Sequence, residues 1–145
     1  MIAFERPAKG VAKELLLVEG NSMIGSIILS TARQLNLHPI RVANNCQSAQ
    51  IFLENQIFCG LITSLEEAEA ALTIIQRLRL GQLKCAANMP VAVTTTQCDV
   101  SMANRIKALN VQRILLKPFK IRDLILTIQT LTATPPDDIL RNAPR

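Results

Sequence analysis

The sequence predicts a single α/β domain in which helices cover both faces of a parallel β-sheet. Three observations support this prediction. The 145 residues are 49% hydrophobic, which is enough to build one compact core. Short apolar runs alternate along the chain with stretches whose apolar residues recur at helical spacing. These apolar runs are continuous, as expected for strands that are covered on both faces.

Five strands and five helices are expected in strict alternation. The strands are expected at residues 14–18, 39–43, 58–63, 91–94 and 112–116. The helices are expected at residues 22–35, 48–55, 66–80, 100–109 and 120–131.

Apolar runs and a helix cap justify the elements of the first half. The first strand is an apolar run, and Asn21 and Ser22 after it are residue types that cap helix N-termini. In the helix that follows, residues 24–31 keep Ile and Thr at helical spacing. The second strand follows Pro39, and the second helix carries the apolar residues 51–53.

Composition justifies the elements of the second half. The third strand is again apolar, and residues 66–80 after it are the most helical stretch because they are rich in Ala, Leu, Glu and Arg. Glutamates at the start of this helix and arginines at its end also suit the helix dipole. Residues 81–88 are expected to form a loop before the last two strand–helix pairs.

The two ends of the chain differ from its centre in composition. Residues 1–12 are mixed and charged and are interpreted as an N-terminal extension, while residues 13–131 form the domain. Residues 132–145 contain Pro135, Pro136 and Pro144, which is typical of a tail or linker. This segment either leads into an output domain of a longer protein or ends the chain.

Composition also restricts the classes of function. No apolar run reaches the ~18 residues that span a bilayer, and no signal peptide is visible, so a soluble cytoplasmic protein is expected. Sixteen basic against eleven acidic residues give a net charge of +5, which permits an acidic partner. The basic residues are scattered, however, and Phe is the only aromatic type, so nucleic-acid binding is not expected.

The cysteines do not indicate a metal site. The four cysteines show no CxxC spacing, and the only histidine is His38. Zinc sites need ligands at closer, paired spacing. We therefore expect reduced thiols at partly buried positions. The cysteines are Cys46, Cys59, Cys85 and Cys98.

The carboxyl ends of the predicted strands are the place to look for a site, because ligands of open parallel sheets bind there. Polar or charged residues, or a glycine, follow strands one, three, four and five. They are Glu19, Gly20, Ser64, Thr95 and Lys117, the last of which precedes Pro118.

Four segments at these strand ends resemble the receiver domain of two-component response regulators. They are LLVEGN at residues 16–21, GLITS at 60–64, VAVTTT at 91–96 and LLKPF at 115–119. The resemblance covers roughly residues 13–131. It implies a doubly wound, flavodoxin-like (βα)5 fold with strand order 2-1-3-4-5.

The resemblance also shows where the chemistry of the family is missing. Ser64 stands where a receiver has its phosphate-accepting aspartate, and a shift of one residue would put Thr63 there. A serine hydroxyl needs a neighbouring base to become a nucleophile, and His38 precedes the second strand, at the opposite edge of the sheet. Aspartyl phosphorylation is therefore not expected.

The metal site of the family is reduced in the same way. Receivers hold magnesium with two acids after strand one and with the acceptor aspartate, whereas this chain has Glu19, Gly20 and Ser64. One remaining carboxylate predicts weak or absent magnesium binding, and no other cofactor is expected. Glu66 and Glu67 are expected to cap and charge the helix that follows.

Two features match the family and a third departs from it. Thr95 occupies the hydroxyl position, and Lys117-Pro118 matches the phosphoryl-binding lysine and the cis-proline after it. Two simpler interpretations stay open: Thr95 as an ordinary strand residue, and Lys117 as a fixed partner of Glu19. Ile114 stands where receivers carry a Tyr or Phe that reports phosphorylation, and a branched aliphatic side chain cannot swing like a ring.

The leading hypothesis is a pseudo-receiver, a non-enzymatic module that binds another protein or an attached output domain without aspartyl phosphorylation. The resemblance places its contact face on the last helix, the neighbouring strand and the fourth helix, and it also allows a homodimer. Its apolar positions are Ile121, Leu124, Ile125 and Ile128, most of which are expected to belong to the core face of the helix. Its rim charges are Arg105, Lys107, Lys120 and Arg122.

Two alternatives are kept beside this hypothesis. One is a functioning phosphorelay receiver with an atypical acceptor. The other is a flavodoxin-like small-molecule or redox module, against which stand the single glycine after strand one and the lack of aromatic residues to stack a flavin.

Overall fold

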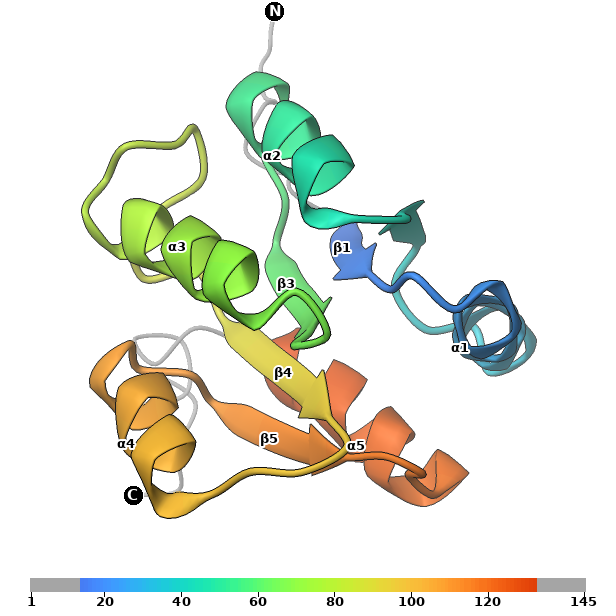
Figure 1. Ribbon diagram of the computed structural model, residues 1–145. Helices are drawn as coiled ribbons and strands as arrows, with labels where there is room; N and C mark the ends of the chain where they lie inside the picture. Colours follow the sequence, from blue (N-terminus) through green and yellow to red (C-terminus); the bar gives the residue numbers. More distant parts are fainter. Residues whose placement is uncertain (1–13, 133–145) are drawn as a thin grey trace, which may run out of the picture.

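The computed structural model describes residues 14–132, which form a five-stranded parallel sheet between two layers of helices (Figure 1). The strands are β1 (Leu15–Val18), β2 (Ile40–Ala43), β3 (Gly60–Ser64), β4 (Val91–Thr95) and β5 (Arg113–Leu116). The helices are α1 (Ser22–Gln34), α2 (Cys46–Asn55), α3 (Ala68–Arg79), α4 (Val100–Ala108) and α5 (Ile121–Leu131). The predicted N-terminal extension and proline-containing tail lie outside these residues.

The sheet has the predicted topology. Its strand order is β2-β1-β3-β4-β5, and all four neighbouring pairs are parallel. The third strand begins at Gly60, two residues later than predicted, and extends to Ser64. The backbone N–H of Phe58 donates to the Cys85 sulfur instead of a neighbouring strand. A Cβ at Gly60 would lie 2.6 Å from Leu15 Cδ2, so the glycine permits β1 and β3 to pack closely.

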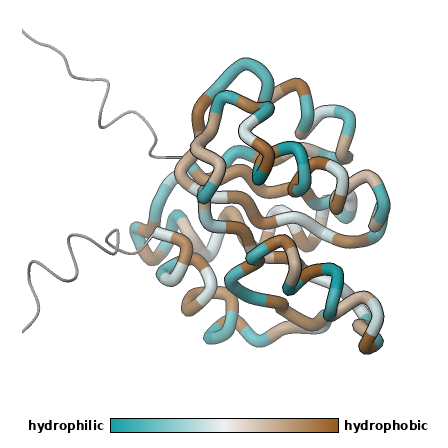
Figure 2. The backbone as a smooth tube through the Cα atoms, turned by 90° about the vertical axis from the view of Figure 1, so that its left-hand side faces the viewer, coloured by the Kyte–Doolittle hydropathy of each residue, from teal (hydrophilic) through white to brown (hydrophobic). Residues whose placement is uncertain are grey.

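Each face of the sheet carries its own apolar cluster. Helices α1 and α5 cover one face, while α2, α3 and α4 cover the other (Figure 1). Because strand side chains alternate, Leu16 and Val18 of β1 pack toward α2 and α3, and Leu15 and Leu17 toward α1 and α5. Burial on both faces explains why the strands are continuous apolar runs, which lie at the centre of the molecule in Figure 2.

Side chains cap the N-termini of three helices, α1, α2 and α4. The Asn21 Oδ1 atom accepts hydrogen bonds from Met23 N (2.9 Å) and Ile24 N (3.1 Å), which confirms the predicted cap of α1. Glu67 was expected to cap α3; it stands at the N-cap position of that helix, but its side chain makes no hydrogen bond to it. Its carboxylate accepts from Cys46 N at 2.8 Å, at the first residue of α2. Because β2 and β3 end at the same edge of the sheet, the first residue of α2 lies beside the turn between β3 and α3.

All four cysteines are free thiols, two of them buried and two partly buried. Burial, together with the Glu67 carboxylate, raises the pKa of the Cys46 thiol to about 11. Burial also raises the pKa values of Cys59 and Cys85. Within residues 14–132, no group of three or more His, Cys, Asp or Glu side chains is placed to hold a metal ion. None of the helices of this part is both long and apolar enough to cross a membrane.

Candidate functional site

The carboxyl ends of β1, β3 and β5 bring three side chains together. The Lys117 ammonium lies 2.8 Å from Glu19 Oε1, although 98 residues separate the two in sequence. The same Nζ atom lies 3.5 Å from the Ser64 hydroxyl oxygen. The parallel topology produces this arrangement, because every strand ends at the same edge of the sheet.

The Glu19–Lys117 pair is shielded from water. The Lys117 side chain is 8% exposed and that of Glu19 is 1% exposed. Burying two charges costs desolvation free energy, and the attraction between them offsets this cost. If one partner were removed, the other charge would stay buried without compensation. The interpretation of Lys117 as a fixed partner of Glu19 is thus confirmed as a contact in the folded domain.

The surroundings of Glu19 leave little for a metal ion. Both of its carboxylate oxygens are hydrogen-bonded, Oε1 to Lys117 and Oε2 to the backbone N–H of Asn21 at 3.1 Å. At Gly20, where receivers have a second acid, an added Cβ would lie 3.3 Å from Asn44 O and 3.6 Å from Glu66 Oε1. A carboxylate at this position would therefore stand next to another carboxylate.

Ser64 is the buried last residue of β3. Its Oγ atom accepts a hydrogen bond from Glu66 N at 3.2 Å. Its other polar neighbour is Lys117, whose Nζ atom is also hydrogen-bonded to Glu19. His38 lies before β2, beside Pro39 at the amino end of the strands, and so offers no base to this hydroxyl.

The remaining predicted positions lie around the ends of β4 and β5. The Thr95 hydroxyl donates to Gln97 O at 2.8 Å and so closes the turn after β4. The Lys117-Pro118 peptide bond is cis, as the resemblance implied. Ile114, at the relay position, is 39% exposed on the edge strand β5.

The sequence did not distinguish Thr94 from the two threonines that follow it. Its side chain is buried, with 1% exposed, and its hydroxyl has no hydrogen-bond partner among the described residues. Thr94 pairs with Ser64 in the sheet register, so this hydroxyl belongs to the same edge as the ion pair. The one sequence signal that could have distinguished these threonines was strand alternation, because successive side chains of a strand point to opposite faces of the sheet.

The predicted contact face changes when burial is known. Leu124 and Ile128 have no exposed surface and so belong to the core face of α5 and not to a contact face, while Ile125 is partly buried. Arg105 forms two 2.8 Å contacts with the Glu69 carboxylate of α3 and therefore points away from β5. Lys107, Lys120, Ile121 and Arg122 are exposed.

The strand next to α5 in the predicted face, β5, carries two exposed apolar side chains. Ile114 is 39% and Leu116 is 55% exposed, whereas Leu115 between them is buried. Ile114 pairs with Val93, whose side chain packs toward α3 and α4. Ile114 and Leu116 stay exposed although α4 lies on that side of the sheet, and the buried residue of α4 is Ile106. We call Ile114 and Leu116 the β5 strip.

Comparisons with known proteins identify the fold. No family model matches the sequence, and no curated protein sequence matches it significantly. A response regulator receiver protein from Pseudomonas putida is similar with a TM-score of 0.71 and 22% identity, over 81% of this chain and 95% of that chain. The chemotaxis response regulator CheY4 of Vibrio cholerae gives 0.70 and 18%, over 81% and 97%. HP1043, an orphan response regulator of H. pylori, gives 0.72 and 15%, over 84% and 98%. The chain thus has the CheY-like fold of receiver domains.

Proposed function

We propose that this chain is a receiver-like signalling domain that acts through protein contacts, without an enzymatic activity and without aspartyl phosphorylation. The buried Glu19–Lys117 pair is the observation that carries the proposal. In the receivers that the chain resembles, the lysine bonds the phosphoryl group. Here it is already bound to a carboxylate at 2.8 Å, with both side chains nearly inaccessible.

The chemistry of Ser64 supports the same conclusion. A phosphorylated receiver needs a carboxylate nucleophile and a magnesium ion to neutralise the incoming phosphate. Ser64 supplies a hydroxyl without a base, and Gly20 supplies no side chain. The one acid left from the metal site, Glu19, has both oxygens occupied.

The β5 strip is the part of the surface that we assign to the partner. Two exposed aliphatic side chains on an edge strand form an apolar centre for a contact. Lys120 and Arg122, after the same strand, are exposed and suit the polar rim of an interface. The partner is another protein, a second copy of this chain or an attached output domain.

Phosphate-analogue binding tests the loss of chemistry. The full chain is mixed with magnesium and either beryllofluoride or acetyl phosphate, and amide spectra and intact masses are recorded. We expect no specific shifts at Ser64, Thr95 and Lys117 and no added phosphate mass. A receiver that accepts phosphate from acetyl phosphate, treated in parallel, verifies the reagents. Shifts centred on these three residues, or a stable phosphate adduct, would contradict the proposal.

Photo-crosslinking tests the contact face separately. A benzophenone amino acid replaces Leu116 in cells of the native host, and Leu80 serves as the matched control because it is also an exposed leucine, outside the β5 strip. We expect a discrete adduct from position 116 that is absent from position 80. The mass of the adduct distinguishes a second copy from another protein. Equal cross-linking at both positions would refute the assignment of the β5 strip.

A further inference from the structure

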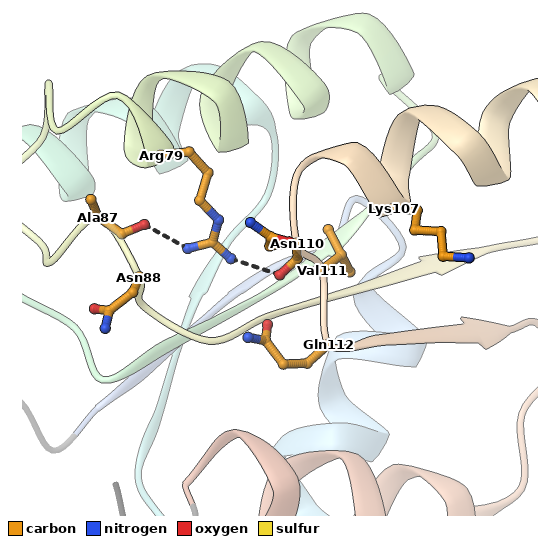
Figure 3. Close-up of a pocket in the computed structure, with 7 residues that line it drawn as sticks. All are labelled: Arg79, Ala87, Asn88, Lys107, Asn110, Val111 and Gln112. Atoms are coloured by element: carbon orange, nitrogen blue, oxygen red, sulfur yellow. Dashed lines mark hydrogen bonds between the residues drawn. The ribbon is translucent and has the colours of Figure 1, made fainter. Parts of the chain in front are cut away.

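A second polar site lies at the opposite end of the sheet from Ser64. It is a pocket of about 700 Å³, which we call the Arg79 pocket (Figure 3). Its residues come from the end of α3, the loop before β4 and the turn between α4 and β5. They are Arg79, Ala87, Asn88, Lys107, Asn110, Val111 and Gln112. The volume falls within the range of small-molecule sites, about 300 to 1,000 Å³.

Arg79 fixes the wall of this pocket. Its guanidinium donates to four backbone carbonyl oxygens, those of Ala87, Met89, Leu109 and Asn110, at 2.7 to 3.1 Å. Figure 3 shows the side chain reaching between Ala87 and Asn110. Two helix C-termini meet here, and their carbonyl groups by themselves favour a cation. Arg79 provides that cation, so these carbonyls are already satisfied.

The groups that remain are mainly donors. Arg79 has five N–H groups and uses four of them. The Oε1 atom of Gln112 accepts a hydrogen bond from Val91 N at 2.7 Å, and its NH₂ group is free to donate to a ligand. The side-chain amides of Asn88 and Asn110 have no hydrogen bond within the described residues. The pocket therefore offers more free N–H groups than free acceptors, and the free side-chain acceptors are the amide oxygens of Asn88 and Asn110.

The charge of the lining has one sign. Lys107 and Arg79 are the charged residues of the pocket, and no carboxylate belongs to its lining. Lys107 is exposed at the rim, with its Nζ directed away from Arg79 (Figure 3), and its flexible stem can bring the ammonium over the opening. Donors and positive charge together select an acceptor-rich, negatively charged ligand.

We propose that the Arg79 pocket binds a small organic anion through its carboxylate or phosphate groups. Arg79 holds the wall in place, the amides of Asn88, Asn110 and Gln112 donate to the oxyanion, and Lys107 supplies charge at the rim. This site is independent of the protein-contact function proposed above. It lies at the amino ends of β4 and β5, a strand length of about 15 Å from Lys117.

Amide spectra of the full chain test the proposal. The protein is titrated with citrate in one arm and inorganic phosphate in the other, at constant ionic strength with sodium chloride as reference. We expect saturable shifts at Asn88, Asn110 and Gln112 in at least one arm, and the stronger arm identifies the preferred oxyanion. Lys107→Glu weakens binding about fivefold to tenfold, while Lys120→Glu, the same charge change outside the pocket, has little effect.

A second variant keeps the test decisive if Lys107→Glu does not fold. Asn88→Leu removes an amide donor from a loop position and is expected to weaken binding about tenfold with unchanged thermal stability. The proposal is overturned if neither anion gives saturable shifts. It is also overturned if Lys107→Glu and Lys120→Glu weaken binding equally, or if Asn88→Leu leaves the affinity unchanged.

Discussion

At the residue scale, two buried threonines in adjacent strands differ in the hydrogen bonding of their hydroxyl groups. Thr63 and Thr94 are both buried, yet only the Thr63 hydroxyl has an acceptor, Ser64 O at 3.2 Å. The Thr94 hydroxyl has no partner among the described residues. A hydroxyl that leaves water without gaining a hydrogen bond reduces the stability of the folded state.

Replacing the Thr94 hydroxyl with a methyl group is therefore expected to stabilise the domain. Thr94→Val keeps the shape of the side chain and should raise the free energy of unfolding by about 1 kcal/mol. Urea denaturation measures the change. Thr63→Val is the matched control and should give no gain, because it removes a hydroxyl that has an acceptor. Equal effects of the two substitutions would contradict the explanation.

The Cys46 thiol gives a prediction about pH. Its pKa is about 11 in the folded domain, against 9.0 for an ordinary thiol. Since the folded pKa is the higher one, the unfolded chain loses this proton first as the pH rises. The thiol's contribution to stability is complete below pH 9 and is lost between pH 9 and 11.

Cys46→Ala should remove this part of the pH dependence. The difference in unfolding free energy between the natural chain and the variant is expected to shrink by about 2 kcal/mol from pH 8.5 to pH 11. Urea denaturation at a series of pH values gives this difference and cancels the titration of other groups. A difference that stays constant over the range would show that burial of Cys46 does not suppress its ionisation.

At the scale of elements, Arg79 joins parts of the chain that no regular hydrogen-bond ladder connects. It stands at the end of α3 and binds carbonyl groups of the loop before β4 and of the turn before β5. Burial lowers the pKa of its guanidinium, which nevertheless stays charged. Its planar fork reaches several acceptors at once, which a lysine ammonium cannot reproduce.

Arg79→Met should destabilise the domain by about 3 kcal/mol or more, because it leaves several carbonyl groups without a donor. Arg79→Lys is expected to recover only part of this loss. Arg105→Met is the control, since Arg105 makes two contacts with one exposed carboxylate, Glu69, and its loss should change stability little. Thermal and urea denaturation measure all three variants. Equal losses for Arg79→Met and Arg105→Met would contradict the role assigned to Arg79.

At the scale of the whole molecule, the Glu19–Lys117 pair ties the first strand to the last. The two residues follow β1 and β5, which are separated in the sheet by β3 and β4. Breaking a buried pair leaves one charge without a partner, and this costs more than removing both charges together.

A double-mutant cycle should reveal this coupling. Lys117→Met is expected to lower the free energy of unfolding by about 3 to 5 kcal/mol, because Glu19 stays buried and unpaired. The double variant Glu19→Gln/Lys117→Met should be more stable than the sum of the single effects predicts. Urea denaturation supplies the four free energies. Strictly additive effects would show that the pair does not hold the two strands together.

Local patterns were sufficient to predict most of the fold. Each strand was a continuous apolar run, α1 was marked by its Asn21 cap, and the strand order followed from the resemblance at the strand ends. The amino end of β3 was misplaced by two residues, because Phe58 is apolar but pairs with Cys85 instead of a strand. Periodicity records which residues are apolar and does not record what they contact.

The candidate site also has features that the sequence predicted and features that it did not. The absence of acids at positions 20 and 64 could be read from the sequence, which left the pairing of Lys117 with Glu19 as one of two open interpretations. The sequence did not show which apolar residues are exposed, because Leu124 and Leu116 are both leucines of the last strand–helix unit. Only packing distinguishes the buried residue from the exposed one.

The sequence by itself determined the alternation of strands and helices, the apolar strands and the absence of acids at positions 20 and 64. These properties depend on residue types and local spacing. Tertiary structure decided that Glu67 caps α2, that Arg79 gathers carbonyl groups from two loops, and that Ile114 and Leu116 stay exposed. These features depend on contacts between residues far apart in the chain, which no local pattern encodes.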